Sequence, residues 1–288
     1  MKYDFMKNHH NEFTISAMSR VLRVSRSGYY DWLKRAPSAR EIRTQTRDQL
    51  IYTAFELGKG RSGSPNIWRD LLEAGHACNP KTVAQSMQRQ GLRAKAARKF
   101  KATTYSKHDL PVAPNLLKQD FSANAPNQKW VGDITYLWTN EGWLYLATIL
   151  DLYSRAVIGW SLSIRIDTKL VCDALTMALW RRNFPGYVIV HSDRGSQYCS
   201  NVYQQLLKDH KLICSMSAKG CCYDNAVAES FFHTLKVEAI HGEPLTTREK
   251  LKHIIFEYIE VDYNRHRRHS TIGYMPPMLF EEKYANVA

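Results

Sequence analysis

From about Pro126 onward, runs of apolar and β-branched residues alternate with short polar turns. The first three runs are rich in β-branched and aromatic residues, which favours strands, and short turns join them into a predicted antiparallel meander. After them, stretches with a helical period alternate with short apolar runs. The predicted elements are strands over 130–139, 143–153 and 156–164, a helix over 168–182, a strand over 188–193, a helix over 200–210, a strand over 212–216 and a helix over 224–236.

This order predicts a fold of the α/β class, a mixed five-stranded sheet with flanking helices. The later strands are expected to be added in parallel through right-handed helical crossovers. If the first strand is central and lies beside the fourth, Asp133 and Asp193 fall on adjacent strands. The helix that carries Glu229 can then pack across them. The spacing permits this arrangement without requiring it.

The first part of the chain has helical periods instead. The predicted helices cover 15–22, 29–35, about 43–57, from Ser64 to before Gly75, and from Asn79 to before Gly91. The first two flank a tight polar turn, which is the pattern of a helix-turn-helix. A proline at the start and a glycine after the end support the boundaries of the last two.

Composition separates these parts of the chain. Pro37 and Ser38 break the chain after the first helical pair, and scattered prolines and polar residues further on are typical of a linker. The expected parts are an all-α helix-turn-helix unit over 1–38, a second helix-turn-helix-like domain with a basic tail over 39–102, a linker over 103–125 and the α/β domain over 126–288. A late helix of this last domain is predicted to start at a capping box, Thr246 with Glu249.

The net charge of +13 is unevenly distributed. Residues 1–125 hold 22 Lys and Arg against 10 Asp and Glu, whereas residues 126–288 hold 18 against 17. Such an excess of positive charge favours the phosphate backbone of nucleic acid as a partner. A merely soluble surface is the alternative, but solubility does not require so uneven a split.

Two segments supply candidate DNA contacts. Lys, Gln and Arg on the outward surface of the helix that begins at Pro80 are residue types that reach base edges and phosphates, although an ordinary solvated face has the same composition. The run 93–101 adds five cations in nine residues, which favours phosphate binding. The candidates are Lys81, Gln85, Gln88, Arg89, Arg93, Lys95, Arg98, Lys99 and Lys101.

A further basic cluster lies near the C-terminal end, at Arg265, Arg267 and Arg268. These residues are predicted to clamp DNA. Alternatively, they cap the preceding helix and form salt bridges with Glu257 or Glu260.

Several classes of protein are excluded. The longest apolar run, 143–150, is far shorter than the ~20 residues that a membrane-spanning helix needs, and the N-terminus lacks the apolar core of a signal peptide. The six cysteines show no C-x-x-C spacing, so reduced thiols are expected and structural zinc is not. The sequence predicts a cytoplasmic protein with no membrane partner.

Three acidic residues carry the candidate chemistry. Asp133 lies within a predicted strand, Asp193 ends another, and Glu229 follows on a helix after a gap of thirty-five residues. An unpaired buried carboxylate costs several kcal/mol, so an aspartate inside a strand needs a partner. A pair of divalent cations shared by the carboxylates is one solution, and salt bridges within the fold are the alternative.

At this point the chain resembles the integrase core of insertion-sequence transposases, and the resemblance covers essentially its whole length. It is similar to the second reading-frame product (OrfB) of the insertion-sequence-three family. The motifs are Trp130-Val-Gly-Asp-Ile-Thr-Tyr136, Asp151-Leu-Tyr-Ser-Arg155, His191-Ser-Asp-Arg-Gly-Ser-Gln-Tyr198, Lys219-Gly-Cys-Cys-Tyr-Asp-Asn-Ala226 with Glu229-Ser-Phe-Phe232, and Tyr263-Asn-Arg265.

The resemblance implies a ribonuclease-H-like fold with the first strand central. It also implies a D-D-E triad at Asp133, Asp193 and Glu229 that holds two Mg²⁺ ions, for which Mn²⁺ can substitute. By its place in the family motif, Lys236 would contact DNA near the scissile phosphate. Gln197 and Tyr198, on the loop after Asp193, would touch DNA as well.

The implied activity is metal-dependent DNA strand cleavage and joining of a 3′-hydroxyl, in copy-out-paste-in transposition. The implied partners are the inverted-repeat ends of the element, target DNA, further copies of the chain in a dimer or larger assembly, and the first reading-frame product (OrfA), separate or fused. The expected location is the bacterial cytoplasm, at the nucleoid. Two alternatives are a non-catalytic DNA-binding regulator of the element and a structure-specific nuclease of the same fold.

Overall fold

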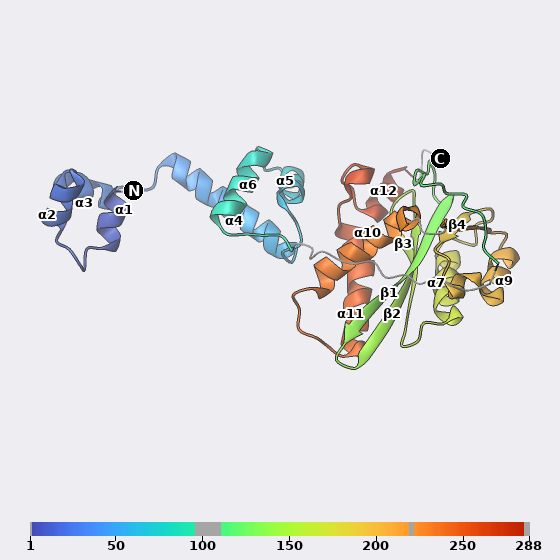
Figure 1. Cartoon of the computed structure of the whole chain (residues 1–288). Coiled ribbons are helices and arrows are strands. Elements are labelled where there is room, and N and C mark those ends of the chain that lie inside the picture. Colours follow the sequence, from blue (N-terminus) through green and yellow to red (C-terminus); the bar gives the residue numbers. More distant parts are fainter. Residues whose placement is uncertain (1, 96–110, 219–221, 285–288) are drawn as a thin grey trace. The chain divides into compact units, whose positions relative to one another are not determined.

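The computed structural model describes residues 2–95, 111–218 and 222–284 (Figure 1). The chain divides into two compact units, Met1–Arg93 and Ala94–Ala288. Within the described ranges, no helix is long and apolar enough to cross a membrane. Arg98, Lys99 and Lys101, three of the predicted DNA contacts, lie outside the described residues.

The first unit begins with a group of three helices, α1 (Lys2–Asn8), α2 (Ile15–Leu22) and α3 (Arg26–Lys34). Met6, Met18 and Tyr29 form its buried core. Ser25 Oγ accepts a hydrogen bond from the amide of Gly28 (3.2 Å), so α3 begins earlier than predicted. The predicted helix over 15–22 is confirmed by α2, whereas α1 has no counterpart among the predicted helices.

A second group of helices follows: α4 (Ala39–Leu57), α5 (Ser64–Glu73) and α6 (Pro80–Arg89). Its core consists of Ile51, Phe55, Ile67, Leu71, Val83 and Met87. Ser38 and Glu41 form a capping box, which starts α4 earlier than predicted. Gly75 and Gly91 have φ of 83° and 68°, the left-handed conformation that glycine adopts without strain, and they confirm the predicted ends of α5 and α6.

The second unit contains the predicted mixed sheet of five strands. The strands are β1 (Lys129–Thr139), β2 (Gly142–Asp151), β3 (Val157–Ser163), β4 (Ile189–Ser192) and β5 (Ile213–Met216). Their order across the sheet is β3-β2-β1-β4-β5. The first three strands pair antiparallel, while β4 pairs parallel with both β1 and β5. The α/β class, the meander and the central place of β1 are therefore confirmed.

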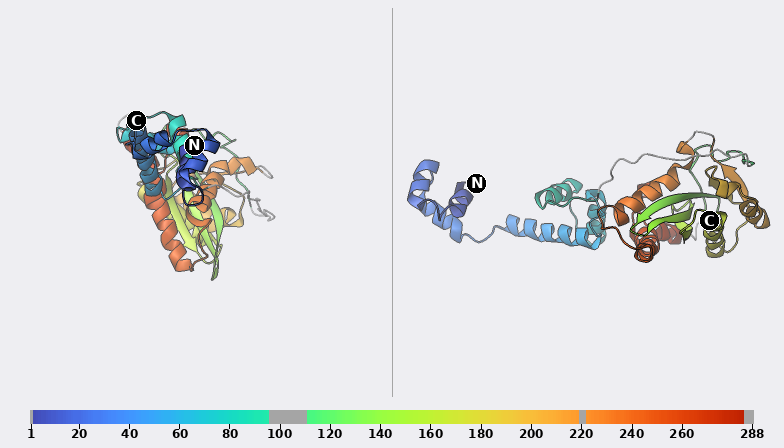
Figure 2. Two further views of the ribbon diagram at one scale, coloured as in Figure 1. Left: turned by 90° about the vertical axis from the view of Figure 1, so that its left-hand side faces the viewer. Right: turned by 60° about the horizontal axis from the view of Figure 1, so that its bottom comes forward.

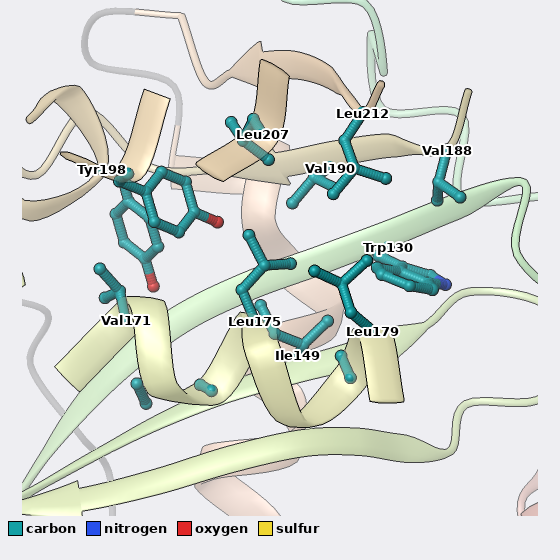
Figure 3. Packing of buried hydrophobic residues seen from close by; sticks show 14 of the residues in the cluster. Trp130, Ile149, Val171, Leu175, Leu179, Val188, Val190, Tyr198, Leu207 and Leu212 are labelled. Carbon is teal, nitrogen blue, oxygen red and sulfur yellow. The ribbon is translucent and has the colours of Figure 1, made fainter. Parts of the chain in front are cut away.

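One face of the sheet is covered by α7 (Thr168–Arg181), α8 (Ser196–Cys199) and α9 (Asn201–Asp209). Figure 3 shows Leu175 and Leu179 of α7 directed toward Val190 and Trp130 of the sheet, inside a core of buried residues. The period of the sequence predicted α7 and α9. The short α8, which directly follows the loop after Asp193, was not predicted.

The other face packs against α10 (Ala226–Leu235), the π-helical turn η2 (Lys236–Ile240), α11 (Arg248–Glu257) and the π-helical segment η3 (Tyr258–His266). Leu235 and Ile255 from these helices meet Val131 and Leu144 of the sheet. Figure 2 shows the long β1–β2 hairpin, which runs past these helices. The described part of the unit also contains η1 (Cys222–Asn225), η4 (Ser270–Ile272) and α12 (Pro277–Tyr284).

The predicted capping box of α11 is wrong, and the start of α10 has no side-chain cap. Thr247, not Thr246, caps α11, because its Oγ1 accepts a hydrogen bond from the amide of Lys250 (3.2 Å). Asn225 occupies the N-cap position of α10, but its side chain makes no capping hydrogen bond. Both side chains of the Asp224–Asn225 pair instead bind other parts of the fold.

Residues 111–125, which the sequence predicts as part of a linker, pack against the sheet. Leu117 is buried in the core on the α10 side, and Ala113 packs against the core on the α7 side. The amide of Leu116 donates a hydrogen bond to Ser215 Oγ (2.9 Å). A composition of prolines and polar residues does not reveal such contacts, because they depend on side chains distant in the sequence.

Candidate active site

The parallel pairing of β1 with β4 places two aspartates side by side. Val131 lies opposite His191 in this pairing, and two residues further along each strand are Asp133 and Asp193. Val131 and Leu137 point into the core on the α10 side, so the alternation along β1 directs Asp133 to the same side. The two carboxylates therefore lie next to each other, on the side of the sheet that faces α10.

Hydrogen bonds from nearby amides hold both carboxylates. Asp133 Oδ1 accepts from the amide of Ile134 (2.8 Å), and Asp193 Oδ1 accepts from the amide of Gly195 (2.9 Å). The second bond lies in the turn directly after β4. Asp193 is therefore at the start of the loop that leads to α8. Both side chains are partly exposed.

The electrostatics of Asp133 connect the acidic residues of the site. Burial raises the pKa of the Asp133 carboxyl, and the negative charges of Asp193 and Glu229 raise it further, while Lys236 acts in the opposite sense. These four groups thus lie within electrostatic range of one another. Like charges at this spacing repel unless a proton or a cation lies between them.

Glu229 occupies the first turn of α10 and is exposed, and burial raises the pKa of its carboxyl. Asn225, which precedes this helix, donates from Nδ2 to the main-chain oxygen of Gly132 (3.3 Å). Even so, among the described residues no three His, Cys, Asp or Glu side chains come together as a group that could hold a metal ion. The structure brings Asp133 and Asp193 together and leaves Glu229 nearby, on the helix that faces them.

The donor chemistry of the two aspartates fits a divalent cation. Carboxylate oxygens are the ligands that Mg²⁺ prefers, and a cation would relieve the repulsion between Asp133 and Asp193. Mg²⁺ keeps several water ligands, so two protein carboxylates suffice to begin a site. Glu229 would have to approach the aspartates to become a third ligand.

Lys236 is the first residue of η2, seven positions after Glu229. Its side chain is partly buried, burial lowers the pKa of its ammonium, and the charge of Asp133 opposes that shift. A cation held beside the carboxylates can receive a phosphodiester. The position of Lys236 therefore agrees with the predicted phosphate contact.

The sequence suggests Tyr198, together with Gln197, as a DNA contact, whereas the structure buries it. Tyr198 is buried in the core on the α7 side, and its hydroxyl finds no hydrogen-bond partner among the described residues. Burial raises the pKa of Tyr198, and the charges of Asp133 and Asp193 raise it further. The sequence feature that points to Tyr198 is its place in the motif that contains Asp193.

Two other acids in the motifs have structural roles. Asp224 accepts hydrogen bonds from the amide of Ala218 (2.8 Å), from Asn115 Nδ2 (2.9 Å) and from Gln119 Nε2 (3.1 Å), so it joins residues 115–119 to η1 and to the segment after β5. Asp151 is fully buried and lies 3.5 Å from Arg182. Its ion-pair partner Arg182 directly follows α7, and Asp151 Oδ1 accepts a hydrogen bond from the amide of Tyr153 (3.0 Å) in the turn after β2.

The predicted DNA contacts on α6 differ in their surroundings. Lys81, Gln85 and Gln88 are exposed, as predicted. Arg89 is also exposed, but its Nη2 binds both oxygens of Asp48 (2.8 and 3.0 Å). Arg89 thus holds α6 against α4, and three side chains remain on the outward surface.

The DNA contacts predicted outside α6 also differ in whether their side chains are exposed or bound to other parts of the fold. Arg93 and Arg265 are exposed. Lys95 Nζ forms an ion pair with Glu243 (2.8 Å), and Gln197 Nε2 reaches the main-chain oxygen of Ile166 at 3.5 Å.

Arg267 and Arg268 are engaged within the fold. Arg267 Nε binds Glu238 Oε1 (3.0 Å), and its guanidinium lies 5.9 Å from the centre of the Tyr263 ring. Arg268 Nη1 donates to the main-chain oxygen of Tyr274 (3.2 Å). The alternative of salt bridges to Glu257 or Glu260 is wrong for Arg267, because its partner is Glu238 on η2.

Comparison with known proteins agrees with this architecture. A family model described as "Integrase core domain" matches residues 123–222, a second model of that description matches 229–284, and a model described as "HTH-like domain" matches 43–100. The first match covers β1 to β5, and the third covers α4 to α6.

The whole chain has close relatives. It is 58% identical over 285 residues to transposase InsF for insertion sequence IS3A of Escherichia coli (strain K12), covering 98% of this chain and 99% of that protein. It is 44% identical over 271 residues to the insertion element IS600 uncharacterized 31 kDa protein of Shigella sonnei, covering 94% and 100%. Among solved structures, the HTLV-2 integrase catalytic core domain in complex with magnesium (trimeric form) is similar with a TM-score of 0.43 and 15% identity, covering 55% of this chain and 99% of that chain.

Proposed function

The chain belongs to the IS3 family of insertion-sequence transposases, and we propose that Asp133, Asp193 and Glu229 are its catalytic carboxylates. It is a DNA transposase with a ribonuclease-H-like integrase core, a polynucleotidyl transferase of the DDE type. The observation that supports the assignment most directly is the parallel register of β1 and β4, which sets Asp133 level with Asp193. Glu229, on α10, is close enough for its negative charge to raise the pKa of the Asp133 carboxyl.

Asp133 and Asp193 are the proposed primary ligands of divalent metal ions, with Glu229 completing the set as α10 approaches the sheet. Two Mg²⁺ ions, or Mn²⁺ in their place, would supply Lewis-acid polarisation of the phosphodiester when bound. Lys236 would hold a non-bridging phosphate oxygen beside the carboxylates. Asn225 would orient α10 through its hydrogen bond to Gly132.

The helical units are the proposed DNA-binding parts, with boundaries at 1–38 and 39–102. The exposed residues Lys81, Gln85 and Gln88 of α6 are suited to base edges and phosphates, and Arg93 extends this surface. Arg265 is the proposed phosphate contact at the C-terminal end of η3. The inverted-repeat ends of the element and target DNA are the proposed substrates.

Transposition must bring two DNA ends together, which supports assembly into a dimer or larger oligomer as part of the proposal. The first reading-frame product, OrfA, is the proposed protein partner, either separate or fused to this chain. Since the substrate is DNA, the proposed place of action is the nucleoid in the bacterial cytoplasm.

The test is a strand-transfer assay with oligonucleotides that carry the ends of the element. The full chain, with and without OrfA, is incubated with Mg²⁺ or with EDTA, and cleaved and joined strands are separated on a denaturing gel. Metal-dependent joining of a 3′-hydroxyl to target DNA supports the proposal. Cleavage without joining would favour the nuclease, and tight end binding with neither reaction under both conditions would favour the regulator.

A further inference from the structure

Lys236 stands at the start of a π-helical turn. This turn, η2, continues α10 without a break, and the amide of His241 donates a hydrogen bond to the main-chain oxygen of Lys236 (2.7 Å), five residues back. A π-helical turn holds more residues than an α-helical turn, so it changes the direction in which the side chains of a helix point. The direction of the Lys236 side chain therefore depends on the contacts that keep η2 in place.

Glu238, in the middle of η2, accepts hydrogen bonds from two residues. Its Oε2 accepts one from the hydroxyl of Tyr258 (2.8 Å), and its Oε1 accepts one from Arg267 Nε (3.0 Å). Tyr258 begins η3, and Arg267 directly follows this segment. Hydrogen bonds to a charged group are stronger than those between neutral groups. The carboxylate thus joins η2 to both ends of η3.

These contacts lie inside the fold. The Glu238 side chain is 13% exposed, and Tyr258 belongs to the buried core on the α10 side. The Arg267 guanidinium also packs 5.9 Å from the centre of the Tyr263 ring. Loss of one partner of a buried ion pair leaves the other charge uncompensated, so the pair is unfavourable to break. Glu238 is therefore held in one position.

Lys236 is close to both Glu238 and the carboxylate site. Its ammonium lies within electrostatic range of Asp133. Only Val237, which is buried, separates Lys236 from Glu238 in the chain. A change in the position of Glu238 would therefore move the lysine relative to the sheet.

We propose that Glu238 is a positioning residue: it holds η2 against η3, so that Lys236 reaches the phosphate at the carboxylate site. The inference rests on the proposed function, which brings DNA to this site and assigns Lys236 to a phosphate oxygen. Arg267, predicted from the sequence as a DNA contact, then contributes through Glu238 instead of touching DNA.

The experiment is a double-mutant cycle on metal-dependent cleavage of end-bearing DNA by the full chain. Lys236→Ala should slow cleavage at least about tenfold, the effect of losing one hydrogen bond to a charged group. Glu238→Gln keeps an acceptor for the Tyr258 hydroxyl but removes the charge that pairs with Arg267, and it should slow cleavage too. In the Glu238→Gln background, Lys236→Ala should slow cleavage by less than about threefold more, because the two changes remove the same contact.

Glu260→Gln is the matched control. Glu260, on η3, accepts hydrogen bonds from Trp160 Nε1 (2.6 Å) and from Arg181 Nη2 (2.7 Å). Like Glu238, it has one aromatic donor and one arginine as partners, but these join η3 to β3 and α7. In the Glu260→Gln background, Lys236→Ala should keep its full effect.

Tyr258→Phe repeats the cycle with a variant that loses a single hydroxyl and is expected to fold. Thermal unfolding shows which variants are folded. The inference is overturned if Glu238→Gln and Tyr258→Phe cleave like the wild-type chain, or if Lys236→Ala keeps its full effect in both backgrounds. It is also overturned if Glu260→Gln reduces the effect of Lys236→Ala equally, because the cycle would then report general loosening of the domain.

A second measurement separates this inference from the proposed function. The salt dependence of DNA binding is measured in EDTA, where no cleavage occurs, and loss of one phosphate contact lowers its slope by about one. Lys236→Ala and Glu238→Gln should each lower the slope by that amount, and the double variant no further. Normal cleavage with an unchanged slope for Lys236→Ala would overturn the inference and leave the catalytic carboxylates standing. The expected slopes in a chain that never cleaves in Mg²⁺ would contradict the catalytic assignment alone.

Discussion

Asn225 donates a hydrogen bond from Nδ2 to the main-chain oxygen of Gly132, 3.3 Å away, and so ties the start of α10 to the residue before Asp133. Asn225 is 4% exposed, which excludes water as a substitute for this bond. This bond therefore links the start of the helix that carries Glu229 to the strand that carries Asp133. We therefore propose that Asn225 helps to position Glu229; its side chain makes no capping hydrogen bond to α10.

Asn225→Ala should reduce metal-dependent strand cleavage more than it reduces stability. Loss of a buried hydrogen bond costs about 1–3 kcal/mol of unfolding free energy, and the chain should remain folded. The matched control is Asn264→Ala, because buried Asn264 bonds both main-chain groups of Val157 (2.9 and 3.0 Å) away from the carboxylates. Urea unfolding and cleavage rates are measured for both. Equal losses of cleavage in the two folded variants would contradict a positioning role.

Gly159→Ala should destabilise the second unit strongly. A Cβ at Gly159 would lie 2.2 Å from the main-chain oxygen of Ala174 and 2.8 Å from Ala178 Cβ, so β3 and α7 would have to separate. Overpacking of this kind costs about 1–3 kcal/mol or more. In the control, Gly186→Ala, the nearest atom is Lys211 Cβ at 3.9 Å, and little change is expected. The melting temperatures of both variants are measured by thermal unfolding. Similar values would contradict the prediction, because they would show that α7 can move away from β3 without loss of stability.

Asp133→Asn should make the chain more stable in the absence of metal. The negative charges of Asp193 and Glu229 act on the partly buried Asp133 carboxyl, and a neutral side chain removes that repulsion. Mg²⁺ should raise the melting temperature of the wild-type chain and have a smaller effect on the variant, because a ligand that binds the folded state stabilises it. Exposed Asp173 on α7 provides the control, Asp173→Asn. A wild-type chain that Mg²⁺ leaves unchanged would contradict the metal site.

Acid should destabilise the chain through His269. Burial lowers the pKa of His269 to about 3, with Arg267 and Arg155 acting in the same direction. The unfolded chain therefore takes up this proton first, and stability falls as the pH drops from the unfolded pKa of about 6.5 toward 3, by at most about 1.4 kcal/mol per pH unit. The stability that neutral His269 maintains is fully present only above that range.

The measurement is the unfolding free energy of wild type and His269→Gln at neutral and mildly acidic pH. The variant should lose less stability on acidification. Some dependence should remain, because burial also lowers the pKa of His191 to about 4. An identical pH dependence in both proteins would show that His269 does not titrate between the folded and unfolded states.

The strands and their antiparallel meander follow from the sequence because period and short turns constrain them locally, whereas the central place of β1 is implied by the resemblance to the integrase core. The strand patterns around Asp133 and Asp193 required no knowledge of tertiary contacts, and the observed order confirms the central place of β1. Ser25 is one of the two caps that the sequence offers for α3, and the structure confirms it, whereas α4 starts earlier than predicted, at the capping box of Ser38 and Glu41.

Other features depend on contacts between distant residues. Leu117 is buried although its segment has the composition of a linker, and Arg267 finds Glu238 only because η2 and η3 lie together. Tyr136, Trp138 and Trp143 are about half exposed. Alternation along β1 and β2 predicts that their side chains share one face of the hairpin, but not that this part of the face stays exposed. The position of Glu229 depends on how α10 docks, which local sequence does not determine.

The most direct measurement compares strand cleavage and DNA binding by Asp133→Asn, Asp193→Asn and Glu229→Gln, with Asp173→Asn as the control. Each of the three variants should bind the ends of the element like the wild-type chain and cleave no faster in Mg²⁺ than in EDTA, whereas the control should cleave normally. Near-normal metal-dependent cleavage by any one of the three variants would contradict the assignment of the catalytic carboxylates.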